Sequence, residues 1–175
     1  MLRRRTLILP QKLKYIYILL WKYLKYKNLK KKIICIITKD GKKSIAEKIL
    51  FNTFFYLRKK TKKNPCTTFL KAIQNVKPLF ELRLQRVSRK IHKIPKLISK
   101  TRQESIALRW IVQTARQEKR TNRKKKIPFS RVLALHLMDA SKKKGPAFQK
   151  KISIYKTAES NRSYISKKTW QKTIN

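Results

Sequence analysis

Acidic residues, histidines and cysteines most often carry catalysis or hold a metal, and in this sequence they are scattered. The 175 residues include seven Asp and Glu, two His and two Cys. No two carboxylates stand at the close spacing that general acid–base or two-metal chemistry uses. Cys35, Cys66, His92 and His136 lie more than twenty residues apart, so no zinc-ligand spacing occurs. We therefore expect a protein that is not an enzyme, with no metal, no cofactor, free thiols and structural histidines.

Lysine and arginine offer a different chemistry, the binding of phosphate groups. Forty-nine Lys and Arg against seven Asp and Glu give a net charge of +42, with an isoelectric point near 11.0. Each cation that meets a nucleic-acid phosphate releases a condensed counterion, so many contacts add up to strong, salt-dependent binding. The sequence predicts a polyanionic partner, with nucleic acid first and an anionic membrane surface second.

Apolar content shows that the chain is more than a basic tail. It is 41% hydrophobic and 10% aromatic, which is enough to form a core in a chain of one-domain length. The longest apolar runs, residues 15–21 and 33–37, fall far short of the roughly 18 residues that a membrane span requires. We expect a folded helical domain without a transmembrane helix.

Local signals predict five or six helices. The basic and aromatic lead, residues 1–28, is compatible with helix in part. An apolar run over 30–38 ends at Asp40 and Gly41, where glycine supplies the positive φ of a tight turn. Ser44 and Glu47 have the spacing of a capping box and predict a helix over 44–60. Asn64 before Pro65 predicts the next helix start, and Pro78 its end.

The second half of the chain shows three further helical patterns. Thr101 and Glu104 form a second predicted capping box, before a helix with an apolar row that includes Trp110. Residues 129–144 predict a helix that Gly145 ends, and apolar spacing then predicts a last helix running to about residue 165. The basic stretch at 119–128 predicts a solvated or RNA-contacting loop.

Between the third and fourth helices the hydrophobic period changes from helical to two. Phe80, Leu82 and Leu84 alternate with polar residues, and a break at residues 88–90 precedes a second strand. The sequence predicts a β-hairpin arm over 79–95, with Ser88, Arg89 and Lys90 at its tip and a one-sided basic face. Because two strands alone are marginally stable in water, such an arm is expected to lie against a partner.

Several blocks, taken in order, resemble the uS7 family of small-subunit ribosomal proteins. They are Asp40-Gly41-Lys42-Lys43-Ser44 with Ala46-Glu47; Ala72-Ile73-Gln74-Asn75-Val76-Lys77-Pro78; Arg86-Val87; Ile94-Pro95; Ala107-Leu108-Arg109-Trp110-Ile111-Val112; Ala115-Arg116; Asp139-Ala140; Gly145; and Ala158-Glu159-Ser160-Asn161-Arg162. The resemblance implies six helices with a hairpin arm, over residues 30–170, between a basic extension (1–29) and a short tail (171–175).

The resemblance also implies a function and partners. Members of the family bind the 3′ major, or head, domain of small-subunit rRNA and nucleate assembly of the head. Their hairpin lies near the exit-site tRNA and the mRNA, and their neighbours include proteins of the uS9 and uS11 families. The expectation is a structural constituent of the small ribosomal subunit with no membrane partner.

Candidate rRNA contacts are cations in the lead, in the turn after the first apolar run, at the end of the helix before the arm, on the arm and on the helix after it. They are Arg3, Arg4, Arg5, Lys42, Lys43, Lys77, Arg83, Arg86, Arg109, Arg116 and Arg120. Arg109 and Arg116 are seven residues apart and therefore share one helix face. For each cation the alternative is a solvated side chain that contacts nothing.

Other readings stay open at this point. A non-ribosomal basic RNA-binding protein is the first alternative; a nuclease or maturase subunit and a membrane-active or chromatin-like polycation are two more. The 35 Lys, 20 Ile and only two Gly suggest AT-rich codons. Together with the basic loop they favour a mitochondrial ribosome, with a plastid as the alternative. Arg3, Arg4 and Arg5 fit either a mitochondrial presequence or an RNA-binding arm.

Overall fold

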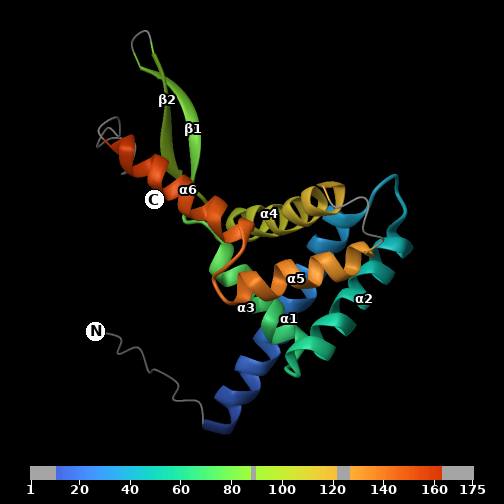
Figure 1. Cartoon of the computed structure of the whole chain (residues 1–175). Coiled ribbons are helices and arrows are strands. Elements are labelled where there is room, and N and C mark those ends of the chain that lie inside the picture. Colours follow the sequence, from blue (N-terminus) through green and yellow to red (C-terminus); the bar gives the residue numbers. More distant parts are fainter. Residues whose placement is uncertain (1–10, 88–89, 122–126, 163–175) are drawn as a thin grey trace, which may run out of the picture.

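The computed structural model describes residues 11–87, 90–121 and 127–162, which form six helices and one two-stranded sheet. In chain order these are α1 (Gln11–Ile37), α2 (Lys43–Thr61), α3 (Pro65–Val76), β1 (Phe80–Val87), β2 (Lys90–Leu97), α4 (Lys100–Thr121), α5 (Phe129–Ser141) and α6 (Pro146–Ser160). The predicted mainly helical fold, with a hairpin between the third and fourth helices, is confirmed (Figure 1).

The core is organised around α5, which packs against α2, α3 and α4. A helix that is apolar on most of its circumference must be covered on most sides, and α5 has this character. Val132, Leu133, Ala134, Leu137 and Ala140 are all buried on it. The first helix packs on α2 and α4 instead, and the outer faces of the helices stay free for the cations.

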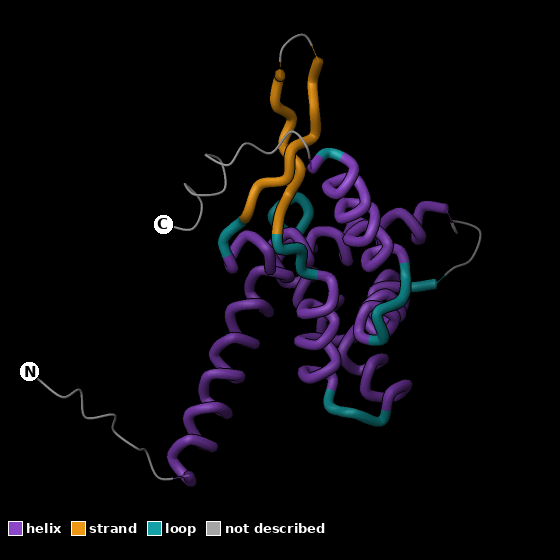
Figure 2. Tube along the Cα trace, turned by 90° about the vertical axis from the view of Figure 1, so that its left-hand side faces the viewer, coloured by secondary structure: helices purple, strands orange, loops and turns teal. Residues whose placement is uncertain are grey.

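The first helix is much longer than its apolar run suggests. It begins at Gln11 and continues without a break through residues 29 and 30, where the sequence suggested a boundary. Leu29, Ile33 and Ile37 are buried, which places the C-terminal part of α1 in the core. Both views of the fold show its N-terminal part extending away from the helical body, on the side opposite the hairpin (Figures 1 and 2).

One of the predicted helix starts has the expected chemistry. The Asn64 side chain accepts a hydrogen bond of 3.0 Å from the Cys66 N–H, and Pro65 occupies the first helical position. Proline costs nothing there because its missing N–H would have no partner within the helix. The end of α3 also agrees, since the helix stops at Val76 with Pro78 just beyond it.

The two predicted capping boxes are wrong. Lys42 stands at the N-cap of α2, which begins at Lys43, and no side chain caps this end. The fourth helix begins at Lys100, ahead of Thr101, so that threonine lies inside the first turn. Glu104 instead faces α1, where its carboxylate oxygens lie 3.6 Å from Lys25 Nζ and 3.7 Å from Lys32 Nζ. An ion pair between helices has replaced the local cap.

The last two helices are shorter than predicted. The fifth ends at Ser141, where the sequence predicted an end near residue 144, because Lys143 takes a positive φ of 59°. The chain reverses there with the Lys144 N–H donating to the Asp139 carbonyl at 2.8 Å. Gly145 then serves as the N-cap of α6, with φ 86°, so it starts a helix rather than ending one. The sixth helix ends at Ser160, short of the predicted residue 165.

The hairpin forms an antiparallel pair that projects beyond the helices (Figure 2). Its register pairs Phe80 with Leu97 at the base and Val87 with Lys90 toward the tip. The strands therefore begin one residue later and end two residues later than the predicted 79–95. We call residues Phe80–Leu97 the arm.

Candidate nucleic-acid interface

The base of the arm is anchored to α6 by an aromatic contact. The rings of Phe80 and Tyr155 lie with centroids 4.7 Å apart, and the Leu79 N–H donates to the Tyr155 hydroxyl at 3.2 Å. This contact with α6 gives the two strands the support that an isolated hairpin lacks. The arm can therefore keep a fixed direction relative to the helical body.

A second anchor ties the arm to α4 through charge. Glu81 Oε1 lies 3.0 Å from Arg83 Nε, and Glu81 Oε2 lies 2.8 Å from Arg102 Nε in the first turn of α4. Burial alone would raise the pKa of Glu81, but the hydrogen bonds from Arg102 and Arg83 outweigh it and hold this pKa below its usual value. Arg83, a candidate rRNA contact, is thus half-exposed and already shares its Nε with a carboxylate.

The arm has two different faces, and its cations are divided between them. Successive residues of a strand point to opposite sides, so Arg83 and Arg86 cannot share a face. The predicted one-sided basic face is wrong for this reason. The register pairs Leu84 with Lys93 and Arg86 with Ile91, which places these four on one face.

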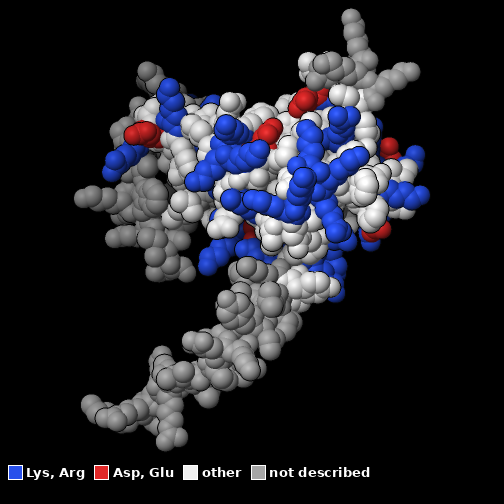
Figure 3. All heavy atoms as spheres, turned by 60° about the horizontal axis from the view of Figure 1, so that its bottom comes forward, with Lys and Arg blue, Asp and Glu red and all other residues white. Residues whose placement is uncertain are grey.

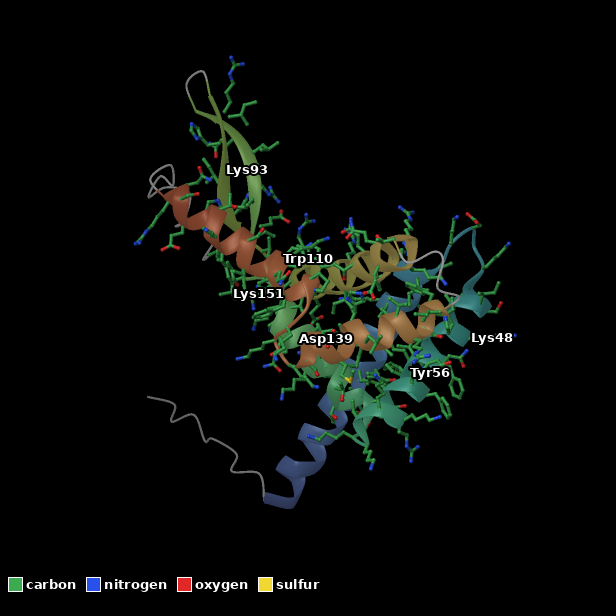
Figure 4. The ribbon with its side chains drawn as sticks, viewed as in Figure 1. Lys48, Tyr56, Lys93, Trp110, Asp139 and Lys151 are labelled. Atoms are coloured by element: carbon green, nitrogen blue, oxygen red, sulfur yellow. The ribbon has the colours of Figure 1, made fainter. Side chains whose placement is uncertain are left out.

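That face alternates cations with apolar side chains. Leu84 and Ile91 are 72% and 67% exposed, and Arg86 and Lys93 are exposed as well. Figure 4 shows Lys93 on the arm, away from the helical body. Such a surface can offer charge to phosphates and apolar area to sugars or bases. Arg86 was predicted from the sequence and Lys93 was not, because a lone lysine in a strand gives no signal until the register is known.

The turn between α1 and α2 presents Lys42 and Lys43 to solvent, as the sequence suggested. Asp40 and Gly41 both have positive φ, 53° and 71°, which confirms the tight turn at this place. The Lys43 N–H donates to the Gly41 carbonyl at 2.8 Å, so the backbone of the turn is held closed. Both lysine side chains are free to reach a phosphate.

On α4 the three candidate arginines have different surroundings. Arg109 and Arg120 are exposed. Arg116 is exposed in part, but its Nη2 donates to the backbone carbonyls of Ile36 at 2.9 Å and Ile37 at 3.1 Å. These are among the last carbonyls of α1, which have no partner within that helix. Arg116 is therefore first of all a link between α4 and the end of α1.

Lys77 belongs to a group of lysines brought together from three parts of the chain. Lys151 on α6 donates from Nζ to the Asn75 carbonyl at 2.8 Å, and Lys143 lies in the turn after α5. Burial lowers the pKa of Lys151, and repulsion from Lys143 and Lys77 lowers it further. An anion placed among these three cations would relieve that repulsion. Sequence reasoning missed Lys143 and Lys151, because only the fold brings them near Lys77.

Two arginines tie α4 to neighbouring basic segments. Arg102 ties the start of α4 to the arm, whereas Arg116 ties its later turns to the end of α1, which precedes the turn with Lys42 and Lys43. Lysine and arginine also dominate the face of the body shown in Figure 3, with few acidic residues among them. Of the predicted contacts, Arg3, Arg4 and Arg5, and Ser88 and Arg89 of the tip, lie outside the described residues, while Lys90 begins β2.

The described part of the chain offers little else for chemistry. Within it, no three His, Cys, Asp or Glu side chains gather as metal ligands would. His136 is buried on α5 with Nε2 2.6 Å from Glu118 Oε2 on α4, a position between two packed helices. Cys35 and Cys66 are free thiols. None of the described helices is both long and apolar enough to cross a membrane.

The protein has a six-helix body and a projecting two-stranded arm, and both carry exposed cations. These features define a basic binding protein. Comparison with known proteins identifies its family. The family model described as "Ribosomal protein S7p/S5e" matches residues 11–162. The chain is similar to the small ribosomal subunit protein uS7 of Metamycoplasma arthritidis, with 40% identity over 133 residues, covering 76% of this chain and 81% of the relative.

Two further bacterial relatives agree. The uS7 protein of Kosmotoga olearia is 43% identical and that of Thermotoga maritima 39% identical, each over 133 residues, 76% of this chain and 82% of the relative. The chain therefore belongs to the ribosomal protein S7p/S5e family. Membership makes it a structural protein and not an enzyme, as the scattered carboxylates had suggested.

Proposed function

We propose that this chain is a structural constituent of the small ribosomal subunit that binds the 3′ major domain of its rRNA and nucleates assembly of the head. The family match over residues 11–162 is the observation that carries the proposal. The exposed cations of the arm, of the α1–α2 turn and of α4 support it, because rRNA helices are held by contacts to many phosphates.

The two ends of α4 suggest how one protein holds two RNA segments. The arm and the α1–α2 turn carry separate sets of cations, and α4 joins them through Arg102 at one end and Arg116 toward the other. A rigid helix between two basic sites would fix the distance between the RNA segments that they bind. This is the mechanism that we propose for nucleating the head.

The arm is the part of the protein proposed to lie near the exit-site tRNA and the mRNA. Its support is the face that mixes Arg86 and Lys93 with Leu84 and Ile91, two apolar side chains that the fold leaves exposed. Proteins of the uS9 and uS11 families are the proposed protein neighbours. We propose no membrane partner.

A mitochondrial ribosome is the proposed location, with a plastid ribosome as the alternative. The lysine- and isoleucine-rich composition supports an organellar genome. Fractionation of cells that express the tagged chain tests this, followed by sedimentation of the organelle lysate. The tag should sediment with mitochondrial small subunits; a tag found only with plastid or cytosolic ribosomes would contradict the proposal.

The experiment for the function is a competition across salt concentrations. The full chain is bound to the 3′ major domain of small-subunit rRNA and challenged with scrambled RNA of the same length. We expect a preference of about a hundredfold at physiological salt, roughly 2.7 kcal/mol. Equal affinities with the same salt dependence would contradict the proposal and favour a basic RNA-binding protein outside the ribosome.

A further inference from the structure

An open groove of about 590 Å³ lies between α1 and α2, apart from the cations described above. Its walls are Lys30 and Ile34 from α1 and Glu47, Lys48, Phe51, Asn52 and Phe54 from α2. Figure 4 shows Lys48 on the far side of the body from the arm. The volume falls within the range of sites that hold small organic ligands, roughly 300–1,000 Å³.

The floor of the groove is aromatic and held in place. The Phe54 ring packs against Tyr26 and Phe69, with centroids 6.1 and 5.6 Å apart, so it cannot turn freely. Phe51 stands one turn earlier on α2 and is 73% exposed. An exposed phenyl ring beside a fixed apolar floor is costly in water and provides a flat surface for stacking.

The rim of the groove is charged. Lys30 and Lys48 are exposed on opposite walls, and Glu47 lies beside them. Two cations from two helices favour an anionic ligand, and the exposed Glu47 carboxylate can accept a hydrogen bond from a donor on that ligand. A ligand that combines a negative group, a flat ring and an amino group would use all of these features.

We propose that this groove binds one unpaired RNA nucleotide, with its base stacked on Phe51 and its phosphate held by Lys30 and Lys48. The inference rests on the proposed function because it takes RNA as the partner. It adds a site where RNA is bound through a base as well as through phosphates. Stacking of bases on aromatic side chains combined with cations along the backbone is how proteins bind single-stranded RNA.

An acidic protein helix fits the same groove less well. Glu47 would repel its carboxylates. A nucleotide avoids this repulsion. Its amino groups can donate to Glu47, whereas its phosphate stays at the lysine rim.

Glu47 also predicts which base is preferred. Cytosine presents an amino donor where uracil presents a carbonyl oxygen, and a carboxylate accepts from the first and repels the second. We expect the full chain to bind a cytidine hexamer more tightly than a uridine hexamer. Glu47→Gln should reduce this preference, because an amide can offer either a donor or an acceptor to the base.

The test compares two phenylalanines of one helix. Phe51→Ala should weaken binding of the cytidine hexamer about tenfold, a typical loss for one stacked base, with an unchanged salt dependence because no charge is removed. Phe55 is 62% exposed on the same helix but does not line the groove, so Phe55→Ala is the control and should bind like the parent. Phe51→Trp, which keeps an aromatic ring for stacking, should retain the binding that Phe51→Ala loses.

Ultraviolet crosslinking of the hexamer, mapped by mass spectrometry, locates the contact. Adducts at Phe51, lost in the presence of excess unlabelled hexamer, are expected. Equal affinities for the Phe51→Ala and Phe55→Ala variants would overturn the inference, as would adducts confined to other segments. The result is separable from the ribosomal proposal: loss of preference for the 3′ major domain would contradict that function, while the Phe51 contrast with short RNA would still decide the groove.

Discussion

Arg116 and Ile37 lie 79 positions apart in the chain, yet the arginine's Nη2 donates to the Ile37 carbonyl at 3.1 Å and to the adjacent Ile36 carbonyl at 2.9 Å. One guanidinium nitrogen thus satisfies two carbonyls at the end of α1. The sequence marks Arg116 as a candidate RNA contact because it shares a helix face with Arg109. Its place in the fold gives it a structural task that Arg109 lacks.

This difference predicts opposite results for two matched substitutions. Arg116→Met should lower the free energy of unfolding by about 1.5–3 kcal/mol, the range for hydrogen bonds from a charged donor. Arg109→Met should leave stability within about 0.5 kcal/mol and weaken binding to rRNA. Urea denaturation and RNA titration of both variants check this. A stable Arg116→Met variant would show that the end of α1 needs no side-chain partner.

Glu81 predicts how the arm responds to acid. Its pKa is held below the usual value in the folded protein, so its ionised form adds stability above pH 4.5, and this contribution is lost as pH falls through the lowered pKa. At pH 7, Glu81→Gln should increase amide hydrogen exchange in β1 and β2, because the pairs with Arg83 and Arg102 are gone. Once the pH lies well below the lowered pKa of Glu81, the parent and variant should exchange alike, because both side chains are then neutral. A difference that persists there would exclude charge as its cause.

The two glycines predict a graded loss of stability. Gly41 and Gly145 both have positive φ, where a Cβ is unfavourable, so alanine at either position should destabilise by about 1–2 kcal/mol. At Gly41 the new methyl group meets open space, but at Gly145 it would lie 3.1 Å from Asp139 Cβ. Gly145→Ala should therefore cost more than Gly41→Ala. Thermal unfolding of the two variants measures the difference. Equal losses of stability would mean that the Asp139 side chain can move away from the new methyl group at no cost in free energy.

The mixed face of the arm predicts a specific salt response. Arg86→Ala and Lys93→Ala should each weaken rRNA binding and reduce the slope of log affinity against log salt by about one. The double variant should reduce it by about two. Lys59→Ala, an exposed lysine on α2, serves as the control for general loss of charge. If Arg86→Ala, Lys93→Ala and Lys59→Ala all change the slope equally, the arm makes no phosphate contact beyond the general effect of charge.

Local signals predicted the fold wherever the chain's own neighbours decide the structure. Asn64 and Pro65 start α3 through bonds within four residues, and the change of period at Phe80 belongs to the strand itself. The predicted capping box at Glu104 failed because Lys25 and Lys32 come to it from α1. No sequence window contains both partners of such a pair.

The candidate site divides in the same way. Exposed cations at Lys42, Lys43 and Arg86 follow from the turn and the strand, which local patterns predict. The gathering of Lys77, Lys143 and Lys151 does not, because three separate segments must first pack. The cations of the arm lie on two faces because successive residues of a strand point to opposite sides. The predicted one-sided basic face did not take this alternation into account.

Three helix ends in this protein depend on side chains that are far away in the sequence. Arg116 reaches the end of α1, Asn75 Nδ2 reaches the Ala140 and Ser141 carbonyls of α5, and Lys151 Nζ reaches the Asn75 carbonyl on α3. During synthesis, at 5–20 residues per second, Arg116 is added about 4–16 s after Ile37. For that time the Ile36 and Ile37 carbonyls lack the guanidinium that binds them in the folded protein. The nascent chain must therefore acquire its long-range bonds late, and a chain released before α4 and α6 emerge carries frayed ends on its first and third helices.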